Sequence, residues 1–243
     1  MVMIIRIMVL LVLLSSLAGC KSVQSESNHA AANNQQASNN QPDNNDVPVP
    51  RPKSEIAKIN VQLGMAYLES GDISRAKMKL LLALKQSPES PEPWYSMAYF
   101  LEASGNKEEA NKYYLKAVDL APKRGDTHNN YGTFLCRAGQ YQDSIKQFML
   151  AANAPDYLDP AAAFENAGLC SMQASTYKQA ANYFNQALLK DPGRSLSQLK
   201  LAIVEEKLGN DKRARSLLIQ YLMVAPPTAE SEQLSAKLAR KIG

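Results

Sequence analysis

The chain has 243 residues, of which 45% are hydrophobic and 7% aromatic, and its formal net charge is +4. This apolar content can fill the core of one domain or of two small ones. A domain that grips phosphate backbones normally shows a larger or more clustered basic excess, so the composition disfavours a nucleic-acid partner. Two histidines and three cysteines are few for a metal site or for histidine-based catalysis, which disfavours most enzyme classes.

The first nineteen residues have the pattern of a secretory signal. Arg6 precedes an apolar run over 7–14, which is too short to cross a hydrocarbon layer, since this takes about 20 residues. The sequence Leu17-Ala18-Gly19-Cys20 then resembles the lipobox of bacterial lipoproteins, whose cysteine is acylated and becomes the first residue after cleavage. This resemblance implies a lipoprotein signal peptide over 1–19 and lipidation of Cys20. The alternative is an uncleaved membrane anchor with a chance cysteine.

The segment after Cys20 is polar. Position 21 is Lys rather than Asp, which by resemblance to the sorting pattern of Gram-negative lipoproteins favours the outer membrane. Residues 28–36 contain no large apolar side chain, so this part cannot bury enough surface to offset the entropy of ordering. We therefore predict a lipidated, disordered tether over 20–53, with a root-mean-square span of roughly 30–35 Å.

The remaining residues, 54–243, repeat with a period of 34. Gly71, Gly105 and Gly139 are spaced by this interval, as are Pro88 and Pro122. The next members of both series follow after 70 residues, which indicates two repeats and a two-residue insertion around 154–160. Each repeat must bury an apolar face that only its neighbour can cover, so the repeats are expected to stack.

Thirty-four is the tetratricopeptide period, and the details resemble that family. Leu63-Gly64 followed by Tyr67 matches its first-helix pattern, and Ala110 followed by Tyr114 matches its second-helix pattern. The resemblance implies an all-α tetratricopeptide repeat superhelix. We expect five repeats and a C-terminal capping helix, at 57–90, 91–124, 125–160, 161–194, 195–228 and 229–243.

Several repeat positions have a predicted structural role. The mid-repeat glycines suit the left-handed conformation that ends a helix, and the repeated prolines are expected to start the following helix. Gly64, Gly132 and Gly168 are expected where the two helices of a repeat cross, against the repeated alanines. The aromatic side chains at repeat positions are expected in the core: Tyr67, Trp94, Tyr114, Phe148 and Phe184.

No arrangement typical of catalysis occurs. His128 is the one histidine within 54–243, and it lies at the start of a repeat, where polar residues cap helices. The sequence has no glycine-rich phosphate loop and no HExxH motif. The acidic pairs Glu108-Glu109 and Glu205-Glu206 are expected on solvated helix faces. We predict no enzyme, no metal, no small-molecule substrate and no cofactor besides the covalent lipid on Cys20.

Two cysteines remain once the lipidated one is removed. Cys136 and Cys170 fall in the first helices of adjacent repeats at nearly equivalent heights, and such helices lie about 8–10 Å apart. Because a secretory signal implies an oxidising compartment, we predict a disulfide between them. The alternative is a pair of buried thiols that act as small apolar side chains.

The resemblance to tetratricopeptide arrays also implies a binding groove, because in that family the first helices line a concave surface. Exposed Met and Tyr side chains in such a groove suit an apolar helix or an extended segment of a partner. The alternative, strongest for Val61 and Leu68, is burial between helices. The predicted groove residues are Val61, Met65, Leu68, Tyr95, Tyr99, Asn129, Asn130, Thr133, Leu169 and Met172.

A narrower resemblance concerns the third and fourth repeats. The segment 125–136, Gly-Asp-Thr-His-Asn-Asn-Tyr-Gly-Thr-Phe-Leu-Cys, and the segment 166–170, Asn-Ala-Gly-Leu-Cys, resemble the PilF/PilW family of type IV pilotins. The resemblance implies a lipid-anchored protein at the periplasmic face of the outer membrane of a Gram-negative bacterium. It would bind the type IV pilus secretin and promote its localisation and multimerisation. Two other functions fit a lipid-anchored repeat adaptor: a scaffold for peptidoglycan hydrolases, or an accessory of outer-membrane β-barrel assembly.

Overall fold

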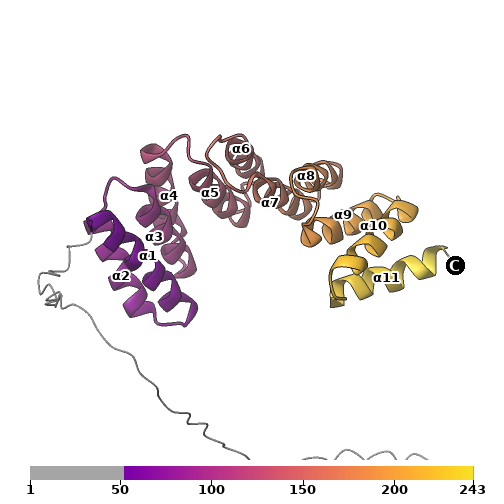
Figure 1. The fold of residues 1–243 in the computed structure, drawn as a ribbon, viewed down its shortest axis with the longest axis horizontal. Coiled ribbons are helices and arrows are strands. Elements are labelled where there is room, and N and C mark those ends of the chain that lie inside the picture. The colour runs from indigo at the N-terminus through magenta and orange to yellow at the C-terminus, as the bar shows by residue number, and fades with distance from the viewer. Residues whose placement is uncertain (1–51, 243) are drawn as a thin grey trace, which may run out of the picture. The chain divides into compact units, whose positions relative to one another are not determined.

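The computed structural model describes residues 52–242, and this range contains eleven α-helices and no strand. Ten of them form five consecutive pairs, and the eleventh closes the array (Figure 1). The predicted all-α tetratricopeptide superhelix is confirmed. The predicted signal peptide, Cys20 and nearly all of the predicted tether lie outside the described residues. The helices are α1 (Lys53–Glu69), α2 (Ile73–Gln86), α3 (Pro91–Ala103), α4 (Lys107–Leu120), α5 (Gly125–Arg137), α6 (Tyr141–Ala152), α7 (Pro160–Gln173), α8 (Tyr177–Lys190), α9 (Ser195–Lys207), α10 (Asp211–Val224) and α11 (Ala229–Ile242).

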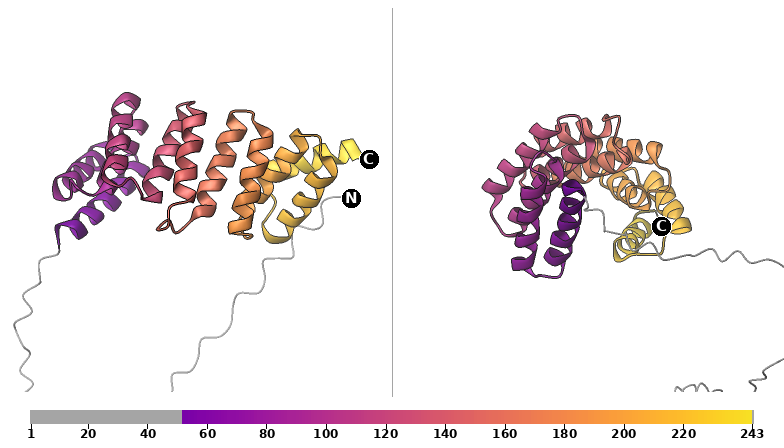
Figure 2. Two further views of the ribbon diagram at one scale, coloured as in Figure 1. Left: turned by 90° about the horizontal axis from the view of Figure 1, so that it is seen from above. Right: turned by 60° about the vertical axis from the view of Figure 1, so that its left-hand side comes forward.

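The odd-numbered helices form the continuous inner layer of the array. Each of α1, α3, α5 and α7 contacts the next odd-numbered helix as well as its own even-numbered partner. Within 52–242, the backbones of successive even-numbered helices from α2 to α10 stay apart on the outer side, although Arg213 of α10 donates a hydrogen bond to Asn185 of α8 at 3.3 Å. Figure 1 shows this for the middle of the array, where α6 and α8 lie outside α5 and α7. Figure 2 shows the same stacking from two further directions.

The turns within repeats follow the predicted glycine pattern, with one exception. Gly71, Gly105, Gly139 and Gly209 all have φ between +79° and +85°, the left-handed region in which glycine carries no steric penalty. In the fourth repeat the same turn is made by Ser175, with φ of 57°. A side chain in this region costs about 1–2 kcal/mol, which the packed helices on both sides must outweigh.

The prediction for the repeated prolines was wrong. Pro88, Pro122, Pro192 and Pro226 each lie three residues before the next helix rather than at its first residue. Each directly follows the C-cap residue of the preceding helix, where a residue without an N–H group prevents the helix from continuing. Prolines that do start helices are Pro91 and Pro160, which are not part of the repeated series.

The glycines of the first helices approach the repeated small residues as expected: a Cβ atom on Gly64 would lie 3.3 Å from the carbonyl oxygen of Ala76, and Ser144, at the same repeat position, donates a hydrogen bond to the carbonyl of Gly132 at 2.8 Å. Large side chains of the second helices lie closer still. A Cβ atom on Gly64 would lie 2.7 Å from Leu80, and one on Gly168 would lie 2.6 Å from Phe184. Gly132 is placed in the same way against Phe148. The bulky side chain therefore occupies the space that a side chain on the first helix would need, and the helices approach closely.

The predicted aromatic core is partly confirmed. Tyr114, Phe148 and Phe184 are buried, and Phe184 is fully covered. Trp94 and Tyr67 are only half-buried. Trp94 donates a hydrogen bond from Nε1 to the carbonyl of Pro88 at 2.7 Å and packs against Tyr113, so it fastens the turn between the first two repeats.

The first and last helices differ in how their outer ends are covered. Leu63 of α1 is 39% exposed, whereas its counterparts one and two repeats later, Met97 and Tyr131, are buried against the preceding repeat. At the other end α11 covers the last pair through Leu234 and Leu238, which pack with Leu218 of α10. No helix among residues 52–242 combines the length and apolarity needed to cross a bilayer.

Glu205 and Glu206 correct the prediction that acidic pairs lie on solvated faces. Both are buried in α9, whereas Glu108 and Glu109 are exposed as expected. Glu206 accepts hydrogen bonds from Lys237 at 2.6 Å and from Lys241 at 2.5 Å, both on α11. Burial acts to raise the pKa of Glu206, but the bonds from the two lysines outweigh it and hold that pKa below its usual value. The capping helix α11 is therefore held by ion pairs with Glu206 as well as by the packing of its leucines.

The pairing of Glu206 predicts that acid loosens α11. Glu206→Gln should lower the free energy of unfolding at pH 7 by about 1–1.5 kcal/mol, modest because both lysines are partly exposed. Because the folded-state pKa lies below the ordinary 4.5, this stabilisation is present above about pH 4.5 and lost as the pH falls through the folded-state pKa. Urea unfolding of the wild type and the variant across this range measures it, with the exposed Glu232→Gln as control. A difference that stays constant down to pH 3 would contradict the assignment.

Candidate functional site

The inner layer contains a hollow of about 390 Å³ where α1, α3 and α5 meet. We call it the tyrosine pocket. Met65 reaches it from α1, and Tyr95 and Tyr99 reach it from the adjacent odd-numbered helix α3. The full lining is Val61, Met65, Tyr95, Ser96, Tyr99, Tyr114, Asn130, Thr133 and Arg137.

The repeat geometry brings these residues together. Val61 and Met65 are one helical turn apart on α1, and Tyr95 and Tyr99 have the same spacing on α3, so each pair lies on one helix face. Contacts between successive odd-numbered helices place the two faces next to each other. Tyr114 of α4 forms part of the floor and packs against Phe134, with the rings tilted and their centroids 4.9 Å apart.

The charges around the tyrosine pocket are matched in pairs. Arg137 donates two hydrogen bonds to Glu102, at 2.7 and 2.6 Å, and these bonds raise the pKa of Arg137 above its usual value. Its guanidinium also lies over the ring of Tyr99, 5.8 Å from the centroid. On the other side Arg124 pairs with Asp126. With these charges already paired, the pocket favours an uncharged, largely apolar ligand group.

Two polar side chains at the pocket remain able to orient a ligand. Burial, with the negative charge of Asp126, raises the pKa of Tyr95 well above its usual value; the phenol donates its hydrogen to Asp126, and its oxygen can accept a hydrogen bond from a ligand. The Tyr95 hydroxyl lies 3.4 Å from Asp126. The side-chain amide of Asn130 forms no hydrogen bond within residues 52–242, so it is available to a peptide group.

The structure assembles six of the ten predicted groove residues and separates the other four. Val61, Met65, Tyr95, Tyr99, Asn130 and Thr133 line the tyrosine pocket. Leu68 packs against the core of the first three repeats, while Leu169 and Met172 pack against the core around α8 and α9. Asn129 accepts a hydrogen bond from Asn166 at 3.0 Å and so links α5 to α7.

Three lining residues, Ser96, Tyr114 and Arg137, are outside the predicted set of groove residues. Ser96 occupies the repeat position of Asn130, exactly one period earlier, so the register alone could have identified it. Tyr114 was expected only as a core residue, and its ring is indeed buried while one edge reaches the pocket. Nothing in the local sequence shows whether a tyrosine at this position lies only in the core or also lines the pocket.

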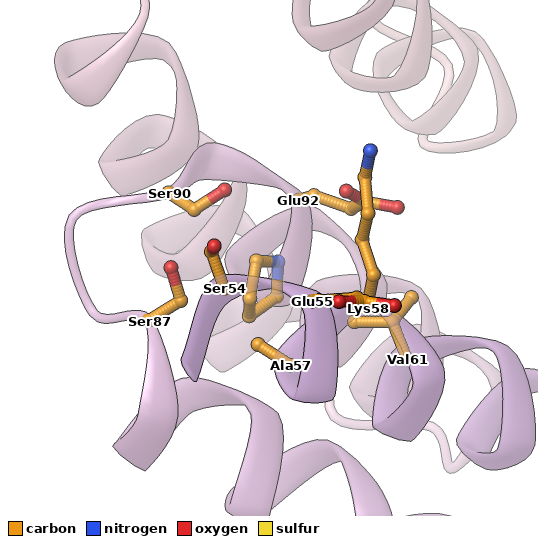
Figure 3. Close-up of a pocket in the computed structure, with 9 residues that line it drawn as sticks. Ser54, Glu55, Ala57, Lys58, Val61, Ser87, Ser90 and Glu92 are labelled. Atoms are coloured by element: carbon orange, nitrogen blue, oxygen red, sulfur yellow. The ribbon is translucent and has the colours of Figure 1, made fainter. Parts of the chain in front are cut away.

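A second hollow of about 240 Å³ lies where α1 begins (Figure 3). The hydroxyls of Ser54, Ser87 and Ser90 gather on one side of it, and Glu55, Lys58 and Glu92 line the other. It shares Val61 with the tyrosine pocket but has no aromatic side chain. Its mixed polar lining offers less apolar surface to a partner, so the tyrosine pocket is the candidate site.

His128 lies away from this site and is fully engaged. It is buried in α5, with Nδ1 2.7 Å from Oε1 of Gln147 and Nε2 2.9 Å from the carbonyl oxygen of Pro122. These contacts tie α5 to α6 and to the turn before α5. Both ring nitrogens are used in structural contacts, so neither is directed at a substrate.

Cys136 and Cys170 are paired in the structure. The bridge joins α5 to α7, with 5.7 Å between the Cα atoms, and both side chains are buried. They pack with Phe148 and Ala167 between the third and fourth repeats. The bridge therefore fixes two neighbouring odd-numbered helices next to the tyrosine pocket.

Sequence comparisons identify the repeats and related proteins. Family models described as tetratricopeptide repeat match residues 61–125, 113–146 and 171–238. An uncharacterised protein of Haemophilus influenzae is 36% identical over 134 residues, which are 55% of this chain and 73% of that protein. The type IV pilus assembly protein PilF of Pseudomonas aeruginosa is 26% identical over 196 residues, 81% of this chain and 78% of PilF.

Solved structures give the same relationship. The structure of Pseudomonas aeruginosa PilF superposes with a TM-score of 0.70 at 26% identity, covering 79% of this chain and 86% of that chain. The structure of PilW, a type IV pilus biogenesis factor, superposes with a TM-score of 0.69 at 26% identity, covering 78% and 87%. The similarity therefore extends over most of the array rather than over one repeat.

The cysteine pair gives a prediction for stability. A bridge that closes a loop with a sequence separation of 34 contributes about 3–4 kcal/mol by restricting the unfolded chain. Cys136→Ala/Cys170→Ala should therefore lower the midpoint of urea unfolding, and reductant should have the same effect on the wild type but none on the variant. Thiol labelling of the denatured protein provides the direct test. Two thiols that label without reductant, after export to an oxidising compartment, would rule the bridge out.

Proposed function

Because this chain belongs to the tetratricopeptide repeat family and is related to the PilF and PilW type IV pilus proteins, we propose that it is a pilotin. In this role it binds a subunit of the type IV pilus secretin and promotes the localisation and multimerisation of the secretin in the outer membrane. The observation that carries the proposal is the similarity to PilF over about four-fifths of both chains.

The tyrosine pocket is the proposed contact site for the secretin. Its volume of about 390 Å³ lies at the small end of the range for ligand sites, and it has room for a few side chains of a peptide segment. Met65 and Tyr99 offer apolar surface, and burying one Leu-sized side chain there contributes about 1.5–3 kcal/mol. Asn130 and Tyr95 supply hydrogen bonds that orient the backbone of the bound segment.

The proposed membrane address is the lipid on Cys20. Several acyl chains anchor a protein stably where one chain is marginal. A polar segment between Cys20 and Lys53 lets the repeat array reorient while it stays near the periplasmic face of the outer membrane. A secretin subunit held in the tyrosine pocket is then carried to the same membrane.

Removing the two pocket tyrosines on α3 tests the contact site. Tyr95→Ala/Tyr99→Ala should weaken secretin binding by about 2 kcal/mol per anchoring side chain, roughly thirtyfold in Kd for each. The measurement is a pull-down from solubilised envelopes followed by titration with the purified secretin. Tyr141→Ala/Tyr177→Ala removes two tyrosines that lie outside the pocket and serves as the matched control, and circular dichroism checks the fold of both variants.

The same pull-down distinguishes the rival functions. Recovery of a secretin that both variants bind equally would place the contact outside the tyrosine pocket. Recovery of peptidoglycan hydrolases or of β-barrel assembly proteins in place of a secretin would overturn the pilotin proposal and favour the scaffold or the accessory function.

Removing the acylated cysteine tests the escort mechanism. Cys20→Ala should leave the repeat array folded, because Cys20 lies 33 residues before α1, but should abolish outer-membrane localisation of the protein. Secretin multimers in the outer membrane should then decrease, as measured by membrane fractionation and unheated gel electrophoresis. Ser22→Ala keeps the lipobox and is the control. Unchanged secretin multimers in the Cys20→Ala strain would argue against an escort.

A further inference from the structure

The outer face of α2 is unusually apolar for an exposed surface. Met78, Leu81 and Leu82 are 49%, 48% and 38% exposed, and together with Arg75 and Lys85 they follow the spacing of one helix face. We call these five residues the α2 outer face. Helix α2 lies in the first repeat, at the indigo end of the array in Figure 2, and on its splayed outer side.

The repeat fold does not require apolar residues at the positions of Met78 and Leu82, whereas the position of Leu81 is apolar in three of the four following repeats. The counterparts of Met78 in the four following repeats are all polar: Lys112, Lys146, Asn182 and Ser216. The counterparts of Leu82 are a lysine, a leucine and two glutamines. Since helices with polar residues at these two positions pack into the same array, the exposed Met78 and Leu82 are not required by the core of the first repeat.

The charge of α2 is also distinct. It carries four basic residues and no acidic one, the largest basic excess among the even-numbered helices. Charges balance in α4 and α6, whereas α8 has two basic and no acidic residues and α10 has three basic and one acidic. Arg75 is paired with Asp72, but Lys77 and Lys85 form no ion pair with any residue of 52–242. Apolar side chains bordered by unpaired lysines are typical of helices that lie in the interface of an anionic bilayer.

The position of α2 in the chain fits the same partner. Asn60 donates a hydrogen bond to Gln86 at 2.8 Å, which places the C-terminal end of α2 beside the first half of α1. The chain that leads to Cys20 joins the array at the start of α1. An anchor on this side gives α2 a high effective concentration at the bilayer, so a weak surface affinity is sufficient.

We propose that the α2 outer face docks on a bilayer that contains anionic phospholipid. Met78, Leu81 and Leu82 enter the boundary between headgroups and acyl chains, and Lys77 and Lys85 contact the phosphate groups. Docking orients the array so that the opposite, inner side of the first repeats, with the tyrosine pocket, faces the aqueous compartment. This inference rests on the lipid anchor of the proposed function, although not on the identity of the protein partner.

The test uses the full acylated protein reconstituted on vesicles, with an environment-sensitive fluorophore on Met78→Cys. The matched control carries the fluorophore on Asn182→Cys, the same repeat position in α8. On vesicles of phosphatidylethanolamine and phosphatidylglycerol the emission of the probe at 78 should shift to shorter wavelength, while that of the probe at 182 should not. Phosphatidylcholine vesicles, or Lys77→Glu/Lys85→Glu, should abolish the shift, and added salt should reduce it.

Flotation of the same vesicles separates the anchor from the docking. Protein that floats without a shift at position 78 would overturn docking and leave the anchor intact. Protein that fails to float would overturn both. An emission shift that grows with protein concentration in the absence of vesicles would assign the α2 outer face to a second copy of the chain. An emission shift that requires envelope proteins would assign it to a protein partner. Either result would overturn the lipid assignment.

Discussion

The two helices of a repeat can approach closely because the first helix lacks a side chain where the second presents a large one. In three repeats this contact is a glycine against Leu80, Phe148 or Phe184, with no space for even one further carbon atom. The contact fixes the separation of the helices within each pair, and therefore which faces remain for the next pair. The continuous inner layer of odd-numbered helices and the splayed outer helices both follow from it.

The tyrosine pocket is a product of this inner layer. Stacked repeats bring side chains one period apart next to each other, so Met65, Tyr99 and Thr133, which belong to three different repeats, line one hollow. Ion pairs between neighbouring helices, such as Arg137 with Glu102, neutralise charge at its edge. The result is a rigid, mostly apolar surface that needs little reorganisation to receive a partner, which limits the entropic cost of binding.

The periodic features of this molecule could be predicted from the sequence, and the features outside the period could not. Register identifies helix pairs, left-handed glycines and most of the pocket, because each recurs every 34 residues. Glu206 escaped prediction because its partners lie on α11, which has no counterpart elsewhere in the array. Ser175 escaped because packing on both sides overrode the preference of that turn for glycine. Leu169 and Met172 have the correct spacing for the groove, but they pack partly buried against the core around α8 and α9.

The two ends of the array respond differently to mechanical load. A stacked repeat array unfolds most readily from an end whose last interface is missing, because each repeat is stabilised only by its neighbours. The C-terminal end is closed by α11, and the middle is cross-linked between α5 and α7, whereas Leu63 of α1, the first helix within residues 52–242, is left partly exposed. Tension transmitted through the chain ahead of α1 therefore acts on the least protected repeat, and the array beyond the cross-link is shielded from it.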